Sequence, residues 1–238
     1  KAGGAAVTNT AGSITSQVSA SPTAGFSVVT WTGDNSASAT AGHGLGSQPS
    51  FVVIKNRTTA RSWPVRHSAL AAGNNVYLDV TNGSTALTAT AHGGVGVLTS
   101  TTIGFLAGSS GFGNVNSTGD NYVAYCFSEV PGYSSFGSYV GNGSTDGVFV
   151  YLGFRPAFVM TKRTDSTGSW LIVDSSRNTY NVVNGYLVPN SSAAEGSATW
   201  GDFTSNGFKM RGTTHNGSGE TYIYMAFAEN PFKNSLAR

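Results

Sequence analysis

Acid–base chemistry has few candidate residues in this chain, and only one group of them is dense. Asp165, Asp174, Glu195 and Asp202 stand closest together among 11 acidic residues in all. Glycosidases need two carboxylates about 5 to 9 Å apart across a sugar bond, and no spacing in the chain enforces such a pair. We interpret these acids as solvated loop residues and turn formers, and we expect no enzyme activity.

The sequence also gives no support for a metal site or a catalytic nucleophile. His43, His67, His92 and His215 are isolated, without the HxH or HExxH spacing of a metal site. Cys126 is the only cysteine, which excludes an intramolecular disulfide and a thiolate zinc cage, and it lies in an apolar run where burial is expected. No G-x-S-x-G elbow is present. We therefore expect no metal site, no cofactor and no catalytic residue.

Binding chemistry has a weaker but wider signal. A sugar offers an apolar face and a rim of hydroxyls, which suits an exposed aromatic ring beside planar polar side chains. In the second half of the chain, Trp200 with Asp202, and Arg163 with Asp165 and Arg177, have these types. The loops expected to present them are 164–169, 177–184 and 191–202. Of the tryptophans, we expect Trp200 to be the exposed one.

The candidate residues lie within an internal sequence repeat, which defines the structural units that hold them. Leu152, Pro156, Phe158, Lys162 and Trp170 each lie 107 residues after Leu45, Pro49, Phe51, Lys55 and Trp63. Tyr222, Phe227 and Glu229 lie 100 residues after Tyr122, Phe127 and Glu129. Because Trp63 and Trp170 recur in register, we expect both to be core residues.

The repeat also defines the fold class. No helical periodicity of ten or more positions occurs, whereas short β-branched and aromatic runs alternate with Gly and Asn turns. Strands are expected at 25–33, 51–56, 63–67, 76–80, 94–98, 103–106, 122–129, 136–141, 148–152, 158–163, 169–173, 186–188, 207–211 and 222–229. This pattern predicts an all-β protein of two tandem antiparallel β-sandwich domains, jelly-roll-like, at 25–131 and 132–238. Residues 1–24 are predicted to be a linker or N-terminal arm with one short strand around 13–18, and Pro64 predicts an edge strand or a bend.

One Lys and one Glu recur beside aromatic residues in both copies. Alternate strand residues share a face, so these anchors follow aromatic residues on sides that can face the core. Two interpretations remain open: the charges lie at strand ends in water, or Lys55 pairs with Glu129 and Lys162 with Glu229.

Composition limits the partners. Only 10% of the 238 residues are charged, the net charge is +2, and the basic residues are scattered, so we expect no nucleic-acid binding. No apolar run reaches the roughly 18 residues of a membrane helix, so no membrane insertion is expected. The chain starts at Lys1 without a signal-peptide pattern, and we expect it to be the C-terminal part of a longer protein or a processed product.

Several segments of the second copy resemble a known module. They are 139–143, 152–163, 168–175, 190–195, 205–208 and 222–231. Together they resemble a tandem repeat module of tailed-bacteriophage tail-fibre and other virion structural proteins, notably of marine and cyanobacterial phages. The resemblance covers about 25–238, and the first copy departs most between Gly73 and Ser100. The family has no assigned catalytic residues, so it implies none here.

The resemblance implies a function on the virion. It implies a non-enzymatic, tail-fibre-type appendage that contacts other virion proteins and a host surface glycan or protein, as a homo-oligomer that is a trimer by analogy. A second hypothesis is a purely structural virion component, such as a capsid decoration, neck or tail protein. A third is a glycan depolymerase.

Overall fold

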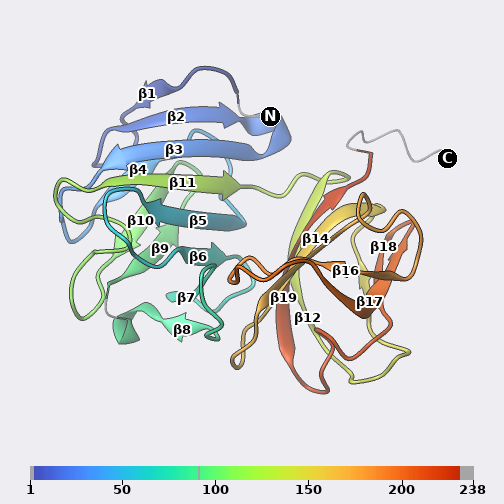
Figure 1. Ribbon diagram of the computed structural model, residues 1–238. Helices are drawn as coiled ribbons and strands as arrows, with labels where there is room; N and C mark the ends of the chain where they lie inside the picture. The colour runs from blue at the N-terminus through green and yellow to red at the C-terminus, as the bar shows by residue number, and fades with distance from the viewer. Residues whose placement is uncertain (1–2, 91, 231–238) are drawn as a thin grey trace. The chain divides into compact units, whose positions relative to one another are not determined.

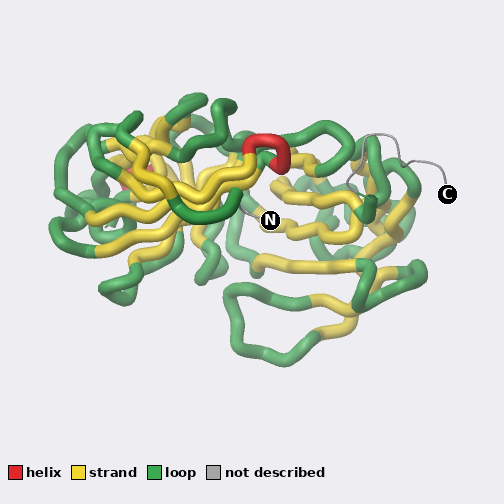
Figure 2. The backbone as a smooth tube through the Cα atoms, turned by 90° about the horizontal axis from the view of Figure 1, so that it is seen from above, coloured by secondary structure: helices red, strands yellow, loops and turns green. Residues whose placement is uncertain are grey.

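The computed structural model describes residues 3–90 and 92–230, and within them the chain is all-β with antiparallel sheets and no α-helix. Strands and loops make up almost all of the described backbone (Figure 2), with short 3-10 turns at Pro22–Ala24 (η1) and Leu87–Ala89 (η2). The chain forms two compact units. Unit 1 runs to Leu78 and includes Ser84–Glu129, and unit 2 contains Asp79–Gly83 and the residues from Val130 onward.

Unit 1 is built from two sheets (Figure 1). The larger has the order β1 (Val7–Asn9), β2 (Ser16–Ser21), β3 (Phe26–Thr32), β11 (Asn121–Phe127), β5 (Phe51–Asn56), β6 (Pro64–His67), β7 (Asn74–Tyr77), β8 (Thr85–Ala86). The smaller has the order β4 (Thr40–Gly42), β10 (Thr102–Leu106), β9 (Gly94–Leu98).

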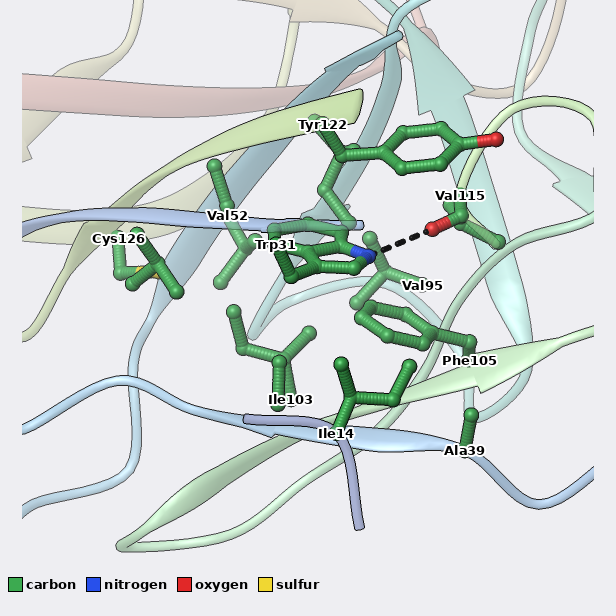
Figure 3. Packing of buried hydrophobic residues seen from close by; sticks show 14 of the residues in the cluster. Ile14, Trp31, Ala39, Val52, Val95, Ile103, Phe105, Val115, Tyr122 and Cys126 are labelled. Carbon is green, nitrogen blue, oxygen red and sulfur yellow. Dashed lines mark hydrogen bonds between the residues drawn. The ribbon is translucent and has the colours of Figure 1, made fainter. Parts of the chain in front are cut away.

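The core of unit 1 lies between these sheets and centres on Trp31 (Figure 3). Its indole stacks between Phe105 of β10, at 5.0 Å, and Tyr122 of β11, at 5.5 Å. The indole Nε1 donates to the Val115 carbonyl at 3.1 Å, so the buried polar atom is satisfied.

Unit 2 is a sandwich of two four-stranded sheets. One has the order β12 (Ser134–Val140), β19 (Thr221–Ala228), β14 (Pro156–Arg163), β15 (Trp170–Asp174), and the other β13 (Phe149–Tyr151), β18 (Gly207–Met210), β17 (Gly196–Thr204), β16 (Val183–Tyr186). Buried side chains of both sheets, including Val159, Trp200 and Phe208, form one cluster. The predicted all-β, sandwich-type fold is confirmed.

The sequence repeat is also a repeat of packing. Tyr139 stacks on Tyr222 with ring centroids 5.2 Å apart, and its hydroxyl donates to the His215 carbonyl at 2.8 Å. In unit 1, Trp31 likewise stacks on a tyrosine and donates to the Val115 carbonyl. Equivalent positions therefore have equivalent surroundings, although the aromatic residues differ.

The N-terminal segment is not the linker or arm predicted from its small polar residues, although the short strand expected around 13–18 overlaps β2. Val18 of β2 pairs with Val29 of β3, and Ile14 bridges Ala41 of β4. Ile14, Ser16 and Val18 are buried, and both apolar side chains belong to the core of unit 1. Side chains on one face of a strand recur at every second residue. Ile14, Ser16 and Val18 follow this period, but the polar Ser16 interrupts the apolar pattern in the sequence.

Gly42 shows how closely this segment packs. A Cβ atom placed on Gly42 would lie 1.9 Å from Asn9 Oδ1. We expect Gly42→Ala to destabilise unit 1 by about 1–3 kcal/mol, since the overlap must displace β1 or β4. Chemical denaturation measures the loss, and a second substitution, Asn9→Ala, should restore part of it. An unchanged unfolding free energy in Gly42→Ala would mean that the segment does not pack on β4.

Three local expectations also need correction. Pro64 opens β6 opposite Tyr77, and β6 lies between β5 and β7 rather than at an edge. Residues 40–42 form β4, and residues 196–204, expected to be mostly loop, form β17. Short or polar strands such as these are held by pairing and burial, which local composition does not report.

The strand register excludes the interpretation in which each recurring lysine pairs with a glutamate. Lys55 lies opposite Val123 and Lys162 opposite Ile223. Each Glu lies six residues further along its strand direction, a separation of roughly 20 Å in extended chain. Glu229 instead forms an ion pair with Arg155, with 3.2 Å between Oε2 and Nε.

Both lysines bind backbone oxygens instead. Lys55 Nζ donates to the Arg61 carbonyl at 3.2 Å and lies 5.1 Å from the ring centroid of Trp63. Trp63 is only half-buried and belongs to neither core cluster, so its prediction as a core residue is wrong. Lys162 is fully buried, and its Nζ donates to the carbonyls of Arg163 at 2.6 Å and Thr81 at 3.2 Å. Neither strand-end solvation nor the Glu pairing therefore describes Lys162.

Candidate functional site

The outer face of the β13–β18–β17 sheet in unit 2 collects aromatic and charged side chains. Phe149 of β13 lies opposite Lys209 of β18, which lies opposite Asp202 of β17. Tyr151 lies opposite Gly207 in the adjoining row. Directly opposed residues of neighbouring strands project to the same face, so these side chains share one surface.

This surface faces solvent. Phe149 is 47% exposed and Tyr151 is 68% exposed, whereas the intervening Val150 is buried in the core. Phe208 of β18, opposite Val150, is also buried. The two exposed rings therefore stand side by side on an edge strand. We call Phe149, Tyr151, Asp202, Lys209 and Arg211 the aromatic platform.

Ion pairs hold the charged side chains of the platform. Arg211 Nε lies 2.5 Å from Asp202 Oδ2, and Lys209 Nζ lies 2.5 Å from Asp146 Oδ1. The hydrogen bond and the charge of Lys209 lower the pKa of Asp146. These pairs fix fork-shaped and carboxylate groups beside the rings while leaving further donors and acceptors on each side chain. The platform can stack on an apolar ring face and hydrogen-bond to hydroxyls.

Trp200 is not exposed, contrary to the sequence prediction. It is fully buried, with its ring 5.9 Å from Phe203 and 5.2 Å from Phe208. Between Ser197 and Gly201, β17 advances four residues while its partner strand advances two, and this irregularity accompanies the inward turn of Trp200. Trp200 has no counterpart in the first copy, but this did not indicate that its side chain is exposed. Trp170, by contrast, is buried as predicted.

Arg163 and Asp165 meet, but in an internal network. Arg163 Nε lies 2.6 Å from Asp165 Oδ1, and Arg163 Nη1 lies 2.5 Å from Glu220 Oε1. Asp165 also accepts the Thr221 N–H at 3.0 Å, and Glu220 accepts the hydroxyl of Tyr222. The network ties the end of β14 to the start of β19, so these charges are engaged in holding the sandwich together.

Arg177 lies in another place, after β15. It pairs with Asp174 at 3.3 Å and with Glu195 at 2.8 Å. The acids that were dense in the sequence thus pair with three arginines, and Asp174 and Glu195 share Arg177. Asp174 and Asp202 lie in β15 and β17, so the prediction of solvated loop acids is wrong for these two. No group of three or more metal-ligating side chains occurs in residues 3–90 and 92–230.

A buried titratable cluster in unit 2 escaped the sequence analysis. His215 Nδ1 lies 2.6 Å from Thr161 Oγ1, and its ring stacks on Tyr222 at 5.3 Å. Burial, helped by the charge of Lys162, lowers the pKa of His215 to about 4. Burial likewise lowers the pKa of Lys162 to about 8, with Arg163 adding to the effect. Ile54 and Val115 are the repeat counterparts of Thr161 and His215. The change from apolar to polar residues between the copies is the sequence signal that could have identified this cluster.

These observations define a two-unit, all-β protein with a solvent-facing aromatic platform on its second unit. Residues 1–231 match the family described as Domain of unknown function (DUF7483), and the chain belongs to that family. No curated protein and no solved structure matches it. The family match spans both units and includes β1 and β2. Among the described residues, no helix has the length and apolar character needed to cross a membrane.

Proposed function

We propose that the chain is a non-enzymatic binding module whose aromatic platform holds a surface saccharide. The observation that carries this proposal is the pair of neighbouring exposed rings, Phe149 and Tyr151, at 47% and 68% exposure on one sheet face. Soluble proteins rarely leave large aromatic side chains adjacent and exposed without an interaction to make.

Saccharide fits this surface better than a purely apolar ligand. Phe149 and Tyr151 lie two residues apart on one face of β13, so each can stack on one of two consecutive sugar units and remove its apolar face from water. The paired charges of Asp202, Lys209 and Arg211 stand beside the rings, where they meet hydroxyls at the sugar rim. Their ion pairs hold them in place before a ligand arrives, which reduces the entropy lost on binding.

The biological setting we propose is the particle of a tailed bacteriophage. The sequence resemblance supports a tail-fibre-type appendage, and the platform supplies a surface for attachment to a host glycan. Other virion proteins are the expected fixed partners, in a homo-oligomer that is trimeric by analogy. The engagement of the dense acids by arginines supports attachment without cleavage.

A second candidate is a purely structural virion component. It is favoured by β13, which is the last strand of its sheet in the described part of unit 2 and can accept a strand from another protein. The two functions differ in what covers Phe149 and Tyr151.

A glycan array followed by titration of the full chain tests the proposal. We expect Tyr151→Ala to weaken binding of a neutral oligosaccharide by about tenfold or more, because truncating an aromatic anchor typically costs over 1 kcal/mol. Tyr180→Ala is the matched control, since Tyr180 is 85% exposed but stands outside the platform. Reducing-sugar release is followed in parallel and should stay at background.

Two outcomes would overturn this function. One is equal binding by Tyr151→Ala and the unmodified chain. The other is absence of glycan binding together with capture of a virion protein by β13, which would favour the structural role. Release of reducing sugar would instead indicate a depolymerase.

A further inference from the structure

We propose that unit 1 carries a second, independent ligand site, a polar groove that takes an acidic saccharide. The groove has a volume of about 280 Å³ and is open to solvent. Its lining is Thr15, Gln17, Thr30, Thr32, Arg57 and Asn121, together with Trp31 and Tyr122, whose side chains are buried. The residues come from the N-terminal segment, from β3, from the start of β11 and from the position just after β5.

Arg57 is the residue that points to a ligand. In the described part of the chain, every other arginine has an ion pair or a hydrogen bond to its side chain, whereas the guanidinium of Arg57 has neither. Its backbone is nevertheless fixed, since Arg57 N donates to the Asn121 carbonyl at 2.7 Å. A guanidinium without a partner at a fixed position, beside a groove, is suited to an external anion.

The neutral side chains of the groove use some of their hydrogen-bonding groups within the protein and keep others for a ligand. Thr32 Oγ1 donates to Asn121 Oδ1 at 3.0 Å, so the Asn121 amide keeps its N–H donors for a ligand. Gln17 Nε2 donates to Thr8 Oγ1 at 3.1 Å, so Gln17 keeps its carbonyl oxygen as an acceptor. The hydroxyls of Thr15 and Thr30 both donate and accept.

This combination selects one ligand chemistry. A carboxylate binds a guanidinium through two parallel hydrogen bonds, and vicinal hydroxyls match amides and threonine hydroxyls. One unpaired cation among neutral polar groups suits one carboxylate-bearing sugar unit, such as a single unit of an oligouronate. A neutral sugar would leave Arg57 unused, and a bare anion would leave the amides and hydroxyls unused.

The groove belongs to unit 1 alone. Thr164 occupies the position of Arg57 in unit 2, since Thr164 N donates to the Thr221 carbonyl as Arg57 N does to Asn121. The equivalent of Asn121 is thus Thr221, and unit 2 has no counterpart of β2 among its described strands. The N-terminal segment, which the sequence analysis took for a linker, therefore builds one wall of a binding site.

Calorimetric titration of the full chain with trigalacturonate tests this inference. We expect trigalacturonate to bind, its fully methyl-esterified form to bind at least about tenfold more weakly, and inorganic sulfate not to compete at equal concentration. Arg57→Lys keeps the charge but loses the fork, and it should weaken trigalacturonate binding by about fivefold or more. Arg57→Gln should weaken it further, and its exposed position makes misfolding a minor concern.

Tyr151→Ala is the control that separates this site from the platform. It should leave trigalacturonate binding in unit 1 unchanged, whereas Arg57→Gln should leave binding of neutral oligosaccharides unchanged. The inference is overturned if trigalacturonate does not bind, if its methyl ester binds as tightly, if sulfate competes equally, or if Arg57→Gln has no effect.

Discussion

Replacing Trp200 with alanine is expected to lower the free energy of unfolding of unit 2 by about 3 to 5 kcal/mol, the usual range for a buried tryptophan. Trp200 has no exposed surface and packs against Phe203 and Phe208 in the centre of the sandwich. Its removal therefore leaves a cavity that the two sheets can fill only by moving together. Chemical denaturation followed by tyrosine and tryptophan fluorescence measures the loss.

Two further variants make this result specific. The Trp200 Nε1 atom has no hydrogen-bond partner in the described structure, so Trp200→Phe removes no hydrogen bond and should cost clearly less than Trp200→Ala. Trp63→Ala should also cost less, since Trp63 is only half-buried. A cost below about 1 kcal/mol for Trp200→Ala would place the ring outside the core.

Acidification is expected to destabilise unit 2 between about pH 6.5 and 4. The pKa of His215 is about 4 in the folded protein, against an ordinary value of 6.5, because the ring is buried beside Lys162. Below pH 6.5 the unfolded chain therefore binds a proton that the folded chain does not, and each such proton favours unfolding. The contribution of His215 to the free energy of unfolding is therefore fully present above pH 6.5. It falls by at most about 3 kcal/mol as the pH drops through 4.

His215→Asn is the variant that isolates this contribution. Asparagine does not titrate, and it tolerates the backbone φ of 55° at position 215 better than most residues. Unfolding free energies measured at several pH values should decline less steeply in His215→Asn than in the unmodified chain. Equal slopes would show that His215 does not resist protonation. Lys162 stays protonated across this window, because its pKa is about 8.

Much of the fold could be predicted because many of its strands have a local sequence pattern typical of β-strands. Residues 51–56 and 94–98 were predicted as strands and are β5 and β9, since β-branched runs bounded by glycine or proline specify strands directly. The two-copy organisation followed from recurring anchors such as Tyr122 and Tyr222, which stack on Trp31 and Tyr139 in the two cores. Unit 2 begins its main stretch at Val130, two residues before the predicted start at 132, and also contains Asp79–Gly83, which the prediction placed in the first domain.

The remaining features depend on pairing, which a single sequence does not encode locally. The run from Val148 to Leu152 is apolar throughout, so alternation could not show that Phe149 and Tyr151 face solvent while Val150 faces the core. Register also separated each lysine from its proposed glutamate. An irregularity in β17 accompanied the inward turn of Trp200, and binding to strand β3 converted a polar N-terminal segment into part of the sheet.

The aromatic platform is tested most directly by mapping backbone amide shifts in the NMR spectrum of the full chain during titration with a neutral oligosaccharide from the array. We expect the shifts to concentrate at 149–151 and 207–211, with smaller changes around Asp202, and to need about tenfold more oligosaccharide or beyond in Tyr151→Ala. Shifts confined to other surfaces, or no shifts at saturating oligosaccharide, would contradict a saccharide site on this face of unit 2.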